Sequence, residues 1–153
     1  MLFRSNPHAE WNFYLDPVSV QITLAHEVVP TLVPLDATKT AAIRNSMIGA
    51  ISGVRSTEAS RIVHEIVGSV KNWINAGHYF AWDAVAAVLL LNPEIGCIVE
   101  QRIKISTDGE FSGRTQRSAV GSLTLCFMNA DIDRFEDEFV SVLMQSSAGA
   151  TDA

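Results

Sequence analysis

The chain has 153 residues, of which 48% are hydrophobic and 18% are charged, and its formal net charge is −6. This composition is typical of one globular domain, which we expect to occupy residues 1–145, followed by a disordered Ser/Ala/Gly tail at residues 146–153. The acidic balance and the lack of a Lys/Arg cluster exclude nucleic acid as a partner. Neither a signal peptide nor an apolar run of bilayer length is seen, so we expect a cytoplasmic protein with no membrane partner.

The first predicted elements are a helix and a short strand. Asp16 and Pro17 form an N-cap followed by proline at the first helical position, which predicts a helix over about residues 17–28. Pro30 ends it, and the apolar run at residues 31–35 suits a buried parallel strand. Residues 36–38 are then expected to form a loop.

The middle of the chain predicts two helices. Over residues 56–75 the apolar side chains recur on one face, which predicts an amphipathic helix that Gly77 ends. Asp83 stands at the natural N-cap of a buried helix at residues 84–91, which Asn92 and Pro93 end. The apolar face of the first helix consists of Ile62, Val63, Ile66, Val67, Val70, Trp73 and Ile74.

The last third predicts three strands and a helix. Residues 97–106, 113–117 and 122–128 alternate or run apolar, and Asp108-Gly109 and Gly121 are turn signals between them. Asp131 is expected to cap a final helix. Its inner face would carry Phe135, Phe139, Val142 and Leu143. Cys97 and Cys126 show no Cys-x-x-Cys spacing, and both are expected to be buried thiols.

Four segments, taken in order, resemble the inosine/uridine-preferring nucleoside hydrolase family and cover most of the chain. Residues 8–17, HAEWNFYLDP, are similar to the family's A-E-(aromatic)-N segment that ends in D-P, and residues 34–38, PLDAT, are similar to its strand end. Residues 79–87, YFAWDAVAA, resemble the segment in which an Asp after His or Trp opens a buried helix. Residues 107–115 and 129–135 resemble the closing strand and the last helix.

The resemblance implies an α/β fold, with a Rossmann-like, mostly parallel sheet and flanking helices, of which this chain would be the C-terminal part without the N-terminal strands. It also implies hydrolysis of the N-glycosidic bond of ribonucleosides to ribose and a free base. Such a reaction passes through an oxocarbenium-like transition state and needs groups that hold the ribose, an activated water and a donor for the departing base.

The resemblance assigns the water to a bound Ca²⁺ and makes Asp83 one of its ligands. Calcium takes about six to eight oxygen ligands, so one carboxylate is not enough. In the family the other carboxylates come from a D-x-D-x-x-x-D-D loop, which is missing here. Asp131, Asp133, Asp137 and Glu138 have nearly that spacing, but they match the family's last helix, and we interpret them as helix N-terminal acids.

The resemblance places Glu10 and Asn12 at the ribose hydroxyls. These residues are two positions apart, so in an extended segment their side chains leave the same face. A plain loop before the Asp16 cap is the other interpretation. Asn6 is a third candidate for substrate binding, although its spacing from Glu10 does not agree clearly with the family's additional Asn.

Trp82 stands where some family members carry a His proposed to protonate the leaving base. An indole can stack on a base or exclude solvent, but it is no general acid near neutral pH. The base then leaves with help from His78, Tyr79 or water, or the site prefers other bases. His8, His26, His64 and His78 otherwise have the context of solvated residues.

The sequence therefore predicts a ribonucleoside hydrolase that is incomplete as this chain. One alternative is a non-catalytic remnant or interaction module. Another is a half-enzyme that needs a separate N-terminal half. A homo-oligomer is a further partner that the resemblance implies.

Overall fold

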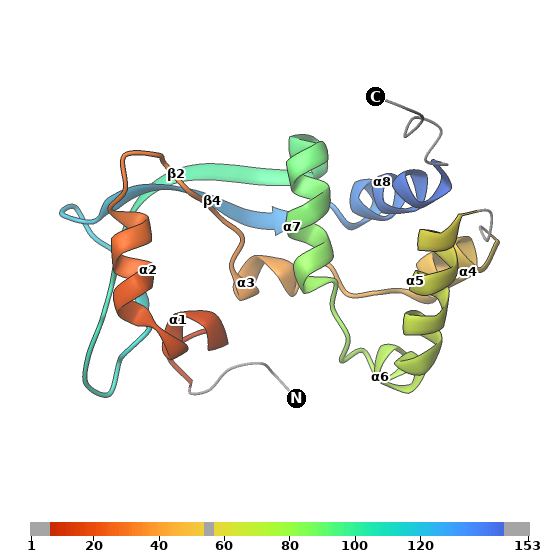
Figure 1. The fold of residues 1–153 in the computed structure, drawn as a ribbon, viewed down its shortest axis with the longest axis horizontal. Coiled ribbons are helices and arrows are strands. Elements are labelled where there is room, and N and C mark those ends of the chain that lie inside the picture. The colour runs from red at the N-terminus through yellow and green to blue at the C-terminus, as the bar shows by residue number, and fades with distance from the viewer. Residues whose placement is uncertain (1–6, 54–56, 146–153) are drawn as a thin grey trace, which may run out of the picture. The chain divides into compact units, whose positions relative to one another are not determined.

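The protein is described here from a computed structural model, which places residues 7–53 and 57–145 (Figure 1). By its internal contacts the chain divides into two compact units, Met1–Leu35 with Ile98–Met128, and Asp36–Cys97 with Asn129–Ala153. Each unit is described by itself. The mixed α/β architecture expected from the sequence is confirmed, whereas a single domain over residues 1–145 stays a prediction, and the tail at residues 146–153 lies outside the described residues.

The sheet of the first unit has four strands in the order β1-β4-β2-β3. β1 pairs with β4 in parallel, with Thr31 opposite Leu125, and β2 pairs with β3 in antiparallel orientation, with Ile103 opposite Arg117. The three later strands fall close to their predicted ranges. The strands are β1 (Thr31–Leu32), β2 (Gly96–Ile105), β3 (Thr115–Arg117) and β4 (Ser122–Ala130), of which β2 begins and β4 ends in the second unit.

Two short helices, α1 (Trp11–Leu15) and α2 (Pro17–Leu24), pack against each other at the start of the first unit. The Asp16 cap is confirmed, because its carboxylate accepts hydrogen bonds from the Ser19 backbone N at 2.9 Å and from the Ser19 hydroxyl at 2.6 Å. α2 ends four residues before the predicted residue 28, because a turn forms in which His26 Nδ1 accepts from Val28 N at 3.2 Å. Inside, Leu24 joins Ile103 and Cys126 in a small core.

β1 is shorter than predicted, and the expected loop at residues 36–38 is instead part of a short helix, α3 (Leu35–Thr38). The chain turns here because the Ala37 and Thr38 carbonyls accept from the backbone N of residues 40 and 41 at 3.0 Å each. The turn signal at Asp108-Gly109 in the β2–β3 connection is confirmed, whereas Gly113, predicted to begin a strand, lies in the turn before β3. Gly109 and Gly113 have φ of 69° and 84°, values that glycine adopts without strain.

The second unit is built mainly from helices. α4 packs against α5 and α8, and α7 packs against η1 and α8. The helix predicted over residues 56–75 is two helices that meet at Val70. Of its apolar face, Val67 and Ile74 are buried, whereas Ile62, Ile66 and Trp73 are about half exposed. The elements are α4 (Asn45–Gly53), α5 (Glu58–Ser69), α6 (Lys71–Asn75), α7 (Trp82–Leu91), η1 (Pro93–Ile95) and α8 (Ile132–Met144).

The last helix, α8, follows the sequence closely. Asp131 caps it by accepting from the backbone N of Asp133 and Arg134, each at 3.2 Å. Phe135 is fully buried and Leu143 nearly so, as expected for the inner face, whereas Val142 is partly exposed. Among the helices that the structure describes, none combines the length and the apolar character needed to cross a membrane.

Candidate functional site

Glu10 is held in place within the first unit by a backbone amide. Its Oε1 accepts a hydrogen bond from Leu35 N at 2.5 Å, and its carbonyl accepts from Tyr14 N at 2.8 Å. Glu10 has extended backbone angles and is the last residue before α1. The half-buried carboxylate therefore joins the segment before α1 to the chain 25 residues later.

Asn12 is the second residue of α1 and is exposed. The expectation that Glu10 and Asn12 share one face of an extended segment was wrong, because the helix begins at Trp11, between them. Asn12 instead lines a groove of about 330 Å³ with residues of α2 and β1. The third candidate, Asn6, lies outside the described residues.

Gly113 supports the α1 segment from the β2–β3 connection. It is buried, and a Cβ on it would lie 2.8 Å from Tyr14 Cα and 2.9 Å from both Ala9 Cβ and the Phe13 carbonyl carbon. The backbone of α1 thus rests directly on this glycine. Sequence reasoning noted Gly113 only as part of a motif, because a close approach between distant backbones leaves no local signal.

Trp82 opens α7 in the second unit and is half-buried among aromatic rings. The ring centroid of Tyr79 lies 5.4 Å away and that of Phe80 lies 5.9 Å away, both in tilted or edge-on arrangements. Such an aromatic cluster offers flat apolar surface to a planar ligand. The sequence singled out Trp82 and Tyr79, and the structure adds Phe80.

Asp83 is exposed in the first turn of α7. The prediction that it is the N-cap was wrong, since Ala81 holds that position and its carbonyl accepts the first helical bond from Val85 N at 2.9 Å. Within residues 7–53 and 57–145, no three His, Cys, Asp or Glu side chains lie together as a metal site would require. Because Ca²⁺ takes about six to eight oxygen ligands, the side chains around Asp83 do not by themselves fit that ion.

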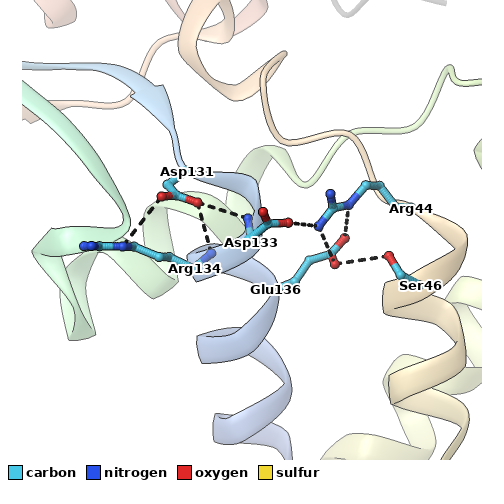
Figure 2. A network of polar contacts seen from close by, with 6 residues as sticks. All are labelled: Arg44, Ser46, Asp131, Asp133, Arg134 and Glu136. Carbon is cyan, nitrogen blue, oxygen red and sulfur yellow. Dashed lines mark hydrogen bonds and ion pairs between the residues drawn. The ribbon is translucent and has the colours of Figure 1, made fainter.

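The acidic residues at the start of α8 serve the fold instead (Figure 2). Arg44 donates from Nε and Nη2 to the two carboxylate oxygens of Glu136, each at 2.8 Å, and from Nη2 to Asp133 at 2.6 Å. Ser46 also reaches Glu136 at 3.2 Å. Both carboxylates raise the pKa of Arg44 above its ordinary value. The interpretation of Asp131 as a helix cap is confirmed.

His8 and His64 make contacts that their sequence context did not predict. His64, expected to be solvated, is half-buried with Nδ1 3.3 Å from the Ser52 hydroxyl, and His8 makes an edge-on ring contact with Phe111 at 4.8 Å. His26 and His78 are exposed, as expected. Cys126 is buried, but Cys97 is exposed, so that part of the cysteine prediction was wrong.

The candidate residues thus form two groups. Glu10 and Asn12 belong to the first unit, and Trp82 and Asp83 belong to the second. The first group is polar and backbone-anchored, while the second combines aromatic surface with one carboxylate.

Several solved structures that match this fold are nucleoside hydrolases. The inosine-uridine preferring enzyme from Bacillus anthracis matches with a TM-score of 0.77 at 17% identity, over 92% of this chain and 46% of its own. A plant nucleoside hydrolase has a TM-score of 0.77 at 14% identity, over 94% and 50%. A purine-preferring ribonucleoside hydrolase from Gardnerella vaginalis has 0.76 at 17%, over 91% and 47%.

A comparison of the sequence with protein-family profiles identifies the family. The profile of the inosine-uridine preferring nucleoside hydrolases matches residues 3–137, so the chain belongs to this family, as its motifs indicated. The chain spans about half the length of the solved relatives. No curated protein matches the sequence.

Proposed function

We propose that this chain supplies part of the active site of a ribonucleoside hydrolase, and that the remaining groups lie in the half of the fold that its solved relatives have and this sequence does not span. The observation that carries the proposal is the extent of the match. About nine-tenths of this chain aligns with less than half of the Bacillus anthracis enzyme. The residues that match the family profile, 3–137, include Glu10, Asn12 and Trp82-Asp83. A homo-oligomer is the alternative source of the missing groups.

The sugar side of the proposed site is the segment of Glu10 and Asn12. Cleavage of an N-glycosidic bond builds positive charge on the ribose ring, so a carboxylate beside the sugar stabilises the transition state more than the ground state. The hydrogen bond from Leu35 N fixes Glu10 before substrate arrives. Asn12 offers an amide donor and acceptor for a hydroxyl group.

The base side of the proposed site is the aromatic cluster of Tyr79, Phe80 and Trp82. Purine and pyrimidine bases are planar and stack on aromatic rings. Trp82 carries no ionisable proton near neutral pH, so it would orient the base without protonating it. In this proposal, protonation of the departing base falls to another group or to water.

Asp83 would contribute one carboxylate to a calcium site whose remaining ligands lie on the other half. Calcium would supply the charge that lowers the pKa of a bound water. The described side chains around Asp83 do not complete that site. We further place the assembled enzyme in the cytoplasm, in nucleoside salvage.

Hydrolysis by the isolated chain tests whether the site is divided. With a chromogenic riboside we expect no detectable turnover, with or without added Ca²⁺, because a single carboxylate does not hold the ion. Robust calcium-dependent turnover that Asp83→Asn abolishes would show that the chain is a complete enzyme. The alternative of a non-catalytic remnant predicts no turnover either, so a binding measurement is needed to separate the two.

Nucleoside binding to the aromatic cluster provides that measurement. The chain has three Trp residues, and the double variant Trp11→Phe/Trp73→Phe leaves Trp82 as the only indole. We expect saturable quenching of its fluorescence by inosine or uridine, and none by ribose alone. The matched control, Trp11→Phe/Trp82→Phe, keeps the half-exposed Trp73 on α6 and should show no saturable quenching. Equal quenching in both variants would contradict a base-binding role for Trp82.

A further inference from the structure

The chain between α3 and α4 lies against the segment that carries the aromatic cluster. We call residues 40–44 the anchor segment. Ile43 N donates to the Tyr79 carbonyl at 3.1 Å, and Ala81 N donates to the Ala41 carbonyl at 2.9 Å. An antiparallel bridge lies between these two bonds, and both alanines are buried. The backbone of the aromatic cluster therefore takes its position from the anchor segment.

The beginning of the anchor segment is fixed next to α8. The Thr40 hydroxyl accepts a hydrogen bond from Ala130 N at 2.9 Å and donates to the Ala37 carbonyl at 2.6 Å. Ala130 is the last residue of β4, and Asp131, which follows it, caps α8. The Thr40 side chain thus ties the anchor segment to the point where the chain enters α8.

Arg44 fixes the other end of the anchor segment to α8 itself (Figure 2). Its guanidinium donates to both carboxylate oxygens of Glu136, each at 2.8 Å, and to Asp133 at 2.6 Å. The side chain of Glu136 is only 11% exposed, so its charge depends on this partner. A bidentate pair also fixes the orientation of the guanidinium, which a single contact would leave free.

The side-chain contact of Arg44 and the backbone contact of Ile43 belong to adjacent residues. One is fixed to α8, and the other carries the Tyr79 carbonyl. The rings of Tyr79 and Phe80 in turn contact Trp82, with centroids 5.4 Å and 5.9 Å away. Because stacking depends on how a ring is placed, a small shift of this backbone changes how the cluster meets a planar ligand.

We propose that Arg44 is a positioning residue for the base side of the hydrolase site. By holding the anchor segment to α8, it sets the backbone that carries Tyr79, Phe80 and Trp82, so that their rings are in place before a nucleoside base stacks on them. Arg44 acts through these residues and does not itself contact the base. This inference rests on the proposed function, because the base belongs to the proposed substrate.

Two variants separate the position of the cluster from the stability of the fold. Both are made in the Trp11→Phe/Trp73→Phe background, in which Trp82 is the only indole. Arg44→Met leaves the buried Glu136 carboxylate unpaired and should lower Tm. Arg44→Met/Glu136→Leu removes that unpaired charge and should regain Tm, but it does not restore the hydrogen bonds that orient the anchor segment.

Two measurements report on the cluster in the three proteins. Hydrogen exchange at the Ala81 amide reports on its bond to the anchor segment, and we expect it to be about tenfold faster in both variants than in the background. Quenching of Trp82 fluorescence reports on inosine binding, and we expect the Kd to rise about tenfold in both. A residue that only stabilised the fold would lose these effects in the double variant, together with the loss in Tm.

Two controls show whether the effects are local. The Asn92 amide bonds to the Val88 carbonyl at 2.8 Å near the end of α7, and its exchange in the double variant should stay at the background rate. Arg134→Met removes another guanidinium of α8, one that reaches the Glu94 carbonyl at 3.1 Å and does not contact the anchor segment. It should leave both the Ala81 exchange and the inosine Kd unchanged.

The outcomes are distinguishable. Unchanged Ala81 exchange in Arg44→Met, or a double variant that regains the exchange rate and the inosine Kd along with Tm, would overturn the proposal. Faster exchange with an unaltered Kd would also overturn it, because the cluster would then bind the base without the anchor. Faster exchange in both variants, with no inosine quenching even in the background protein, would support the anchoring by Arg44 and count against the proposed function.

Discussion

Replacing Gly113 by alanine should destabilise the first unit through two separate costs. The residue has φ of 84°, and an L-residue in the left-handed region costs about 1–2 kcal/mol. Its new methyl group would also lie under 3 Å from three atoms of the α1 segment, the nearest being Tyr14 Cα at 2.8 Å. Overpacking of this kind costs about 1–3 kcal/mol. The sum predicts a loss of about 2–5 kcal/mol in the free energy of unfolding.

Gly109 provides the matched control in the same connection. It also has a positive φ, 69°, but a Cβ there would meet nothing within 4 Å. Gly109→Ala should therefore show only the conformational cost of about 1–2 kcal/mol. Urea unfolding of the three proteins measures the difference. In Gly113→Ala, but not in Gly109→Ala, the amide of Leu35 should also exchange faster, because the displaced α1 segment carries its acceptor, Glu10. Equal destabilisation by the two alanines would refute the contact argument.

Three further predictions concern charge and thiol chemistry. Hydrogen bonds from Ser19 within the α2 cap lower the pKa of Asp16, so the stabilising effect of its carboxylate is present above about pH 4 and is lost as the pH falls through the lowered value. The Tm difference between the wild type and Asp16→Ala should therefore shrink at lower pH. A Tm difference that stays constant with pH would contradict this. Arg44→Met should lower Tm more than Arg44→Met/Glu136→Leu, because the single change leaves the buried Glu136 carboxylate without its guanidinium partner. A double variant that is less stable than the single variant would refute this. Burial raises the pKa of the Cys126 thiol, whereas Cys97 is exposed. Cys97→Ser should therefore remove the fast phase of labelling by a thiol reagent. A fast phase that persists in this variant would show that Cys126 is the accessible thiol.

The sequence predicted best what short-range chemistry determines. Asp16 and Asp131 cap helices, and Gly109 forms a turn, because each feature depends on residues within four positions in the chain. The four family motifs, taken in order, identified the family, which no single local pattern does. Asp83 shows the limit of local reasoning. Asp is a favoured N-cap residue, yet the N-cap is Ala81, two residues earlier, and the helix begins at Trp82.

Long-range contacts escaped prediction for a physical reason. Arg44 and Glu136 are 92 residues apart, and nothing in the composition around either residue specifies its partner. The half-exposed Ile62, Ile66 and Trp73 show a related limit, because the apolar period of a helix does not state whether another element of the same chain covers each residue. Covering such a face depends on tertiary packing, which the pattern leaves open.

The anchoring of Glu10 bears on how a divided active site could work. A carboxylate that holds the ribose is effective only if it is positioned before the substrate binds, since ordering it during the reaction would raise the barrier. In this chain the positioning comes from Leu35 N and from the backbone contact at Gly113, both within the first unit. The proposed sugar side is thus organised within the first unit, whereas a calcium site needs carboxylates beyond Asp83. In the proposed enzyme the other half of the fold would therefore bring the metal ligands, and it need not rebuild the segment that holds Glu10.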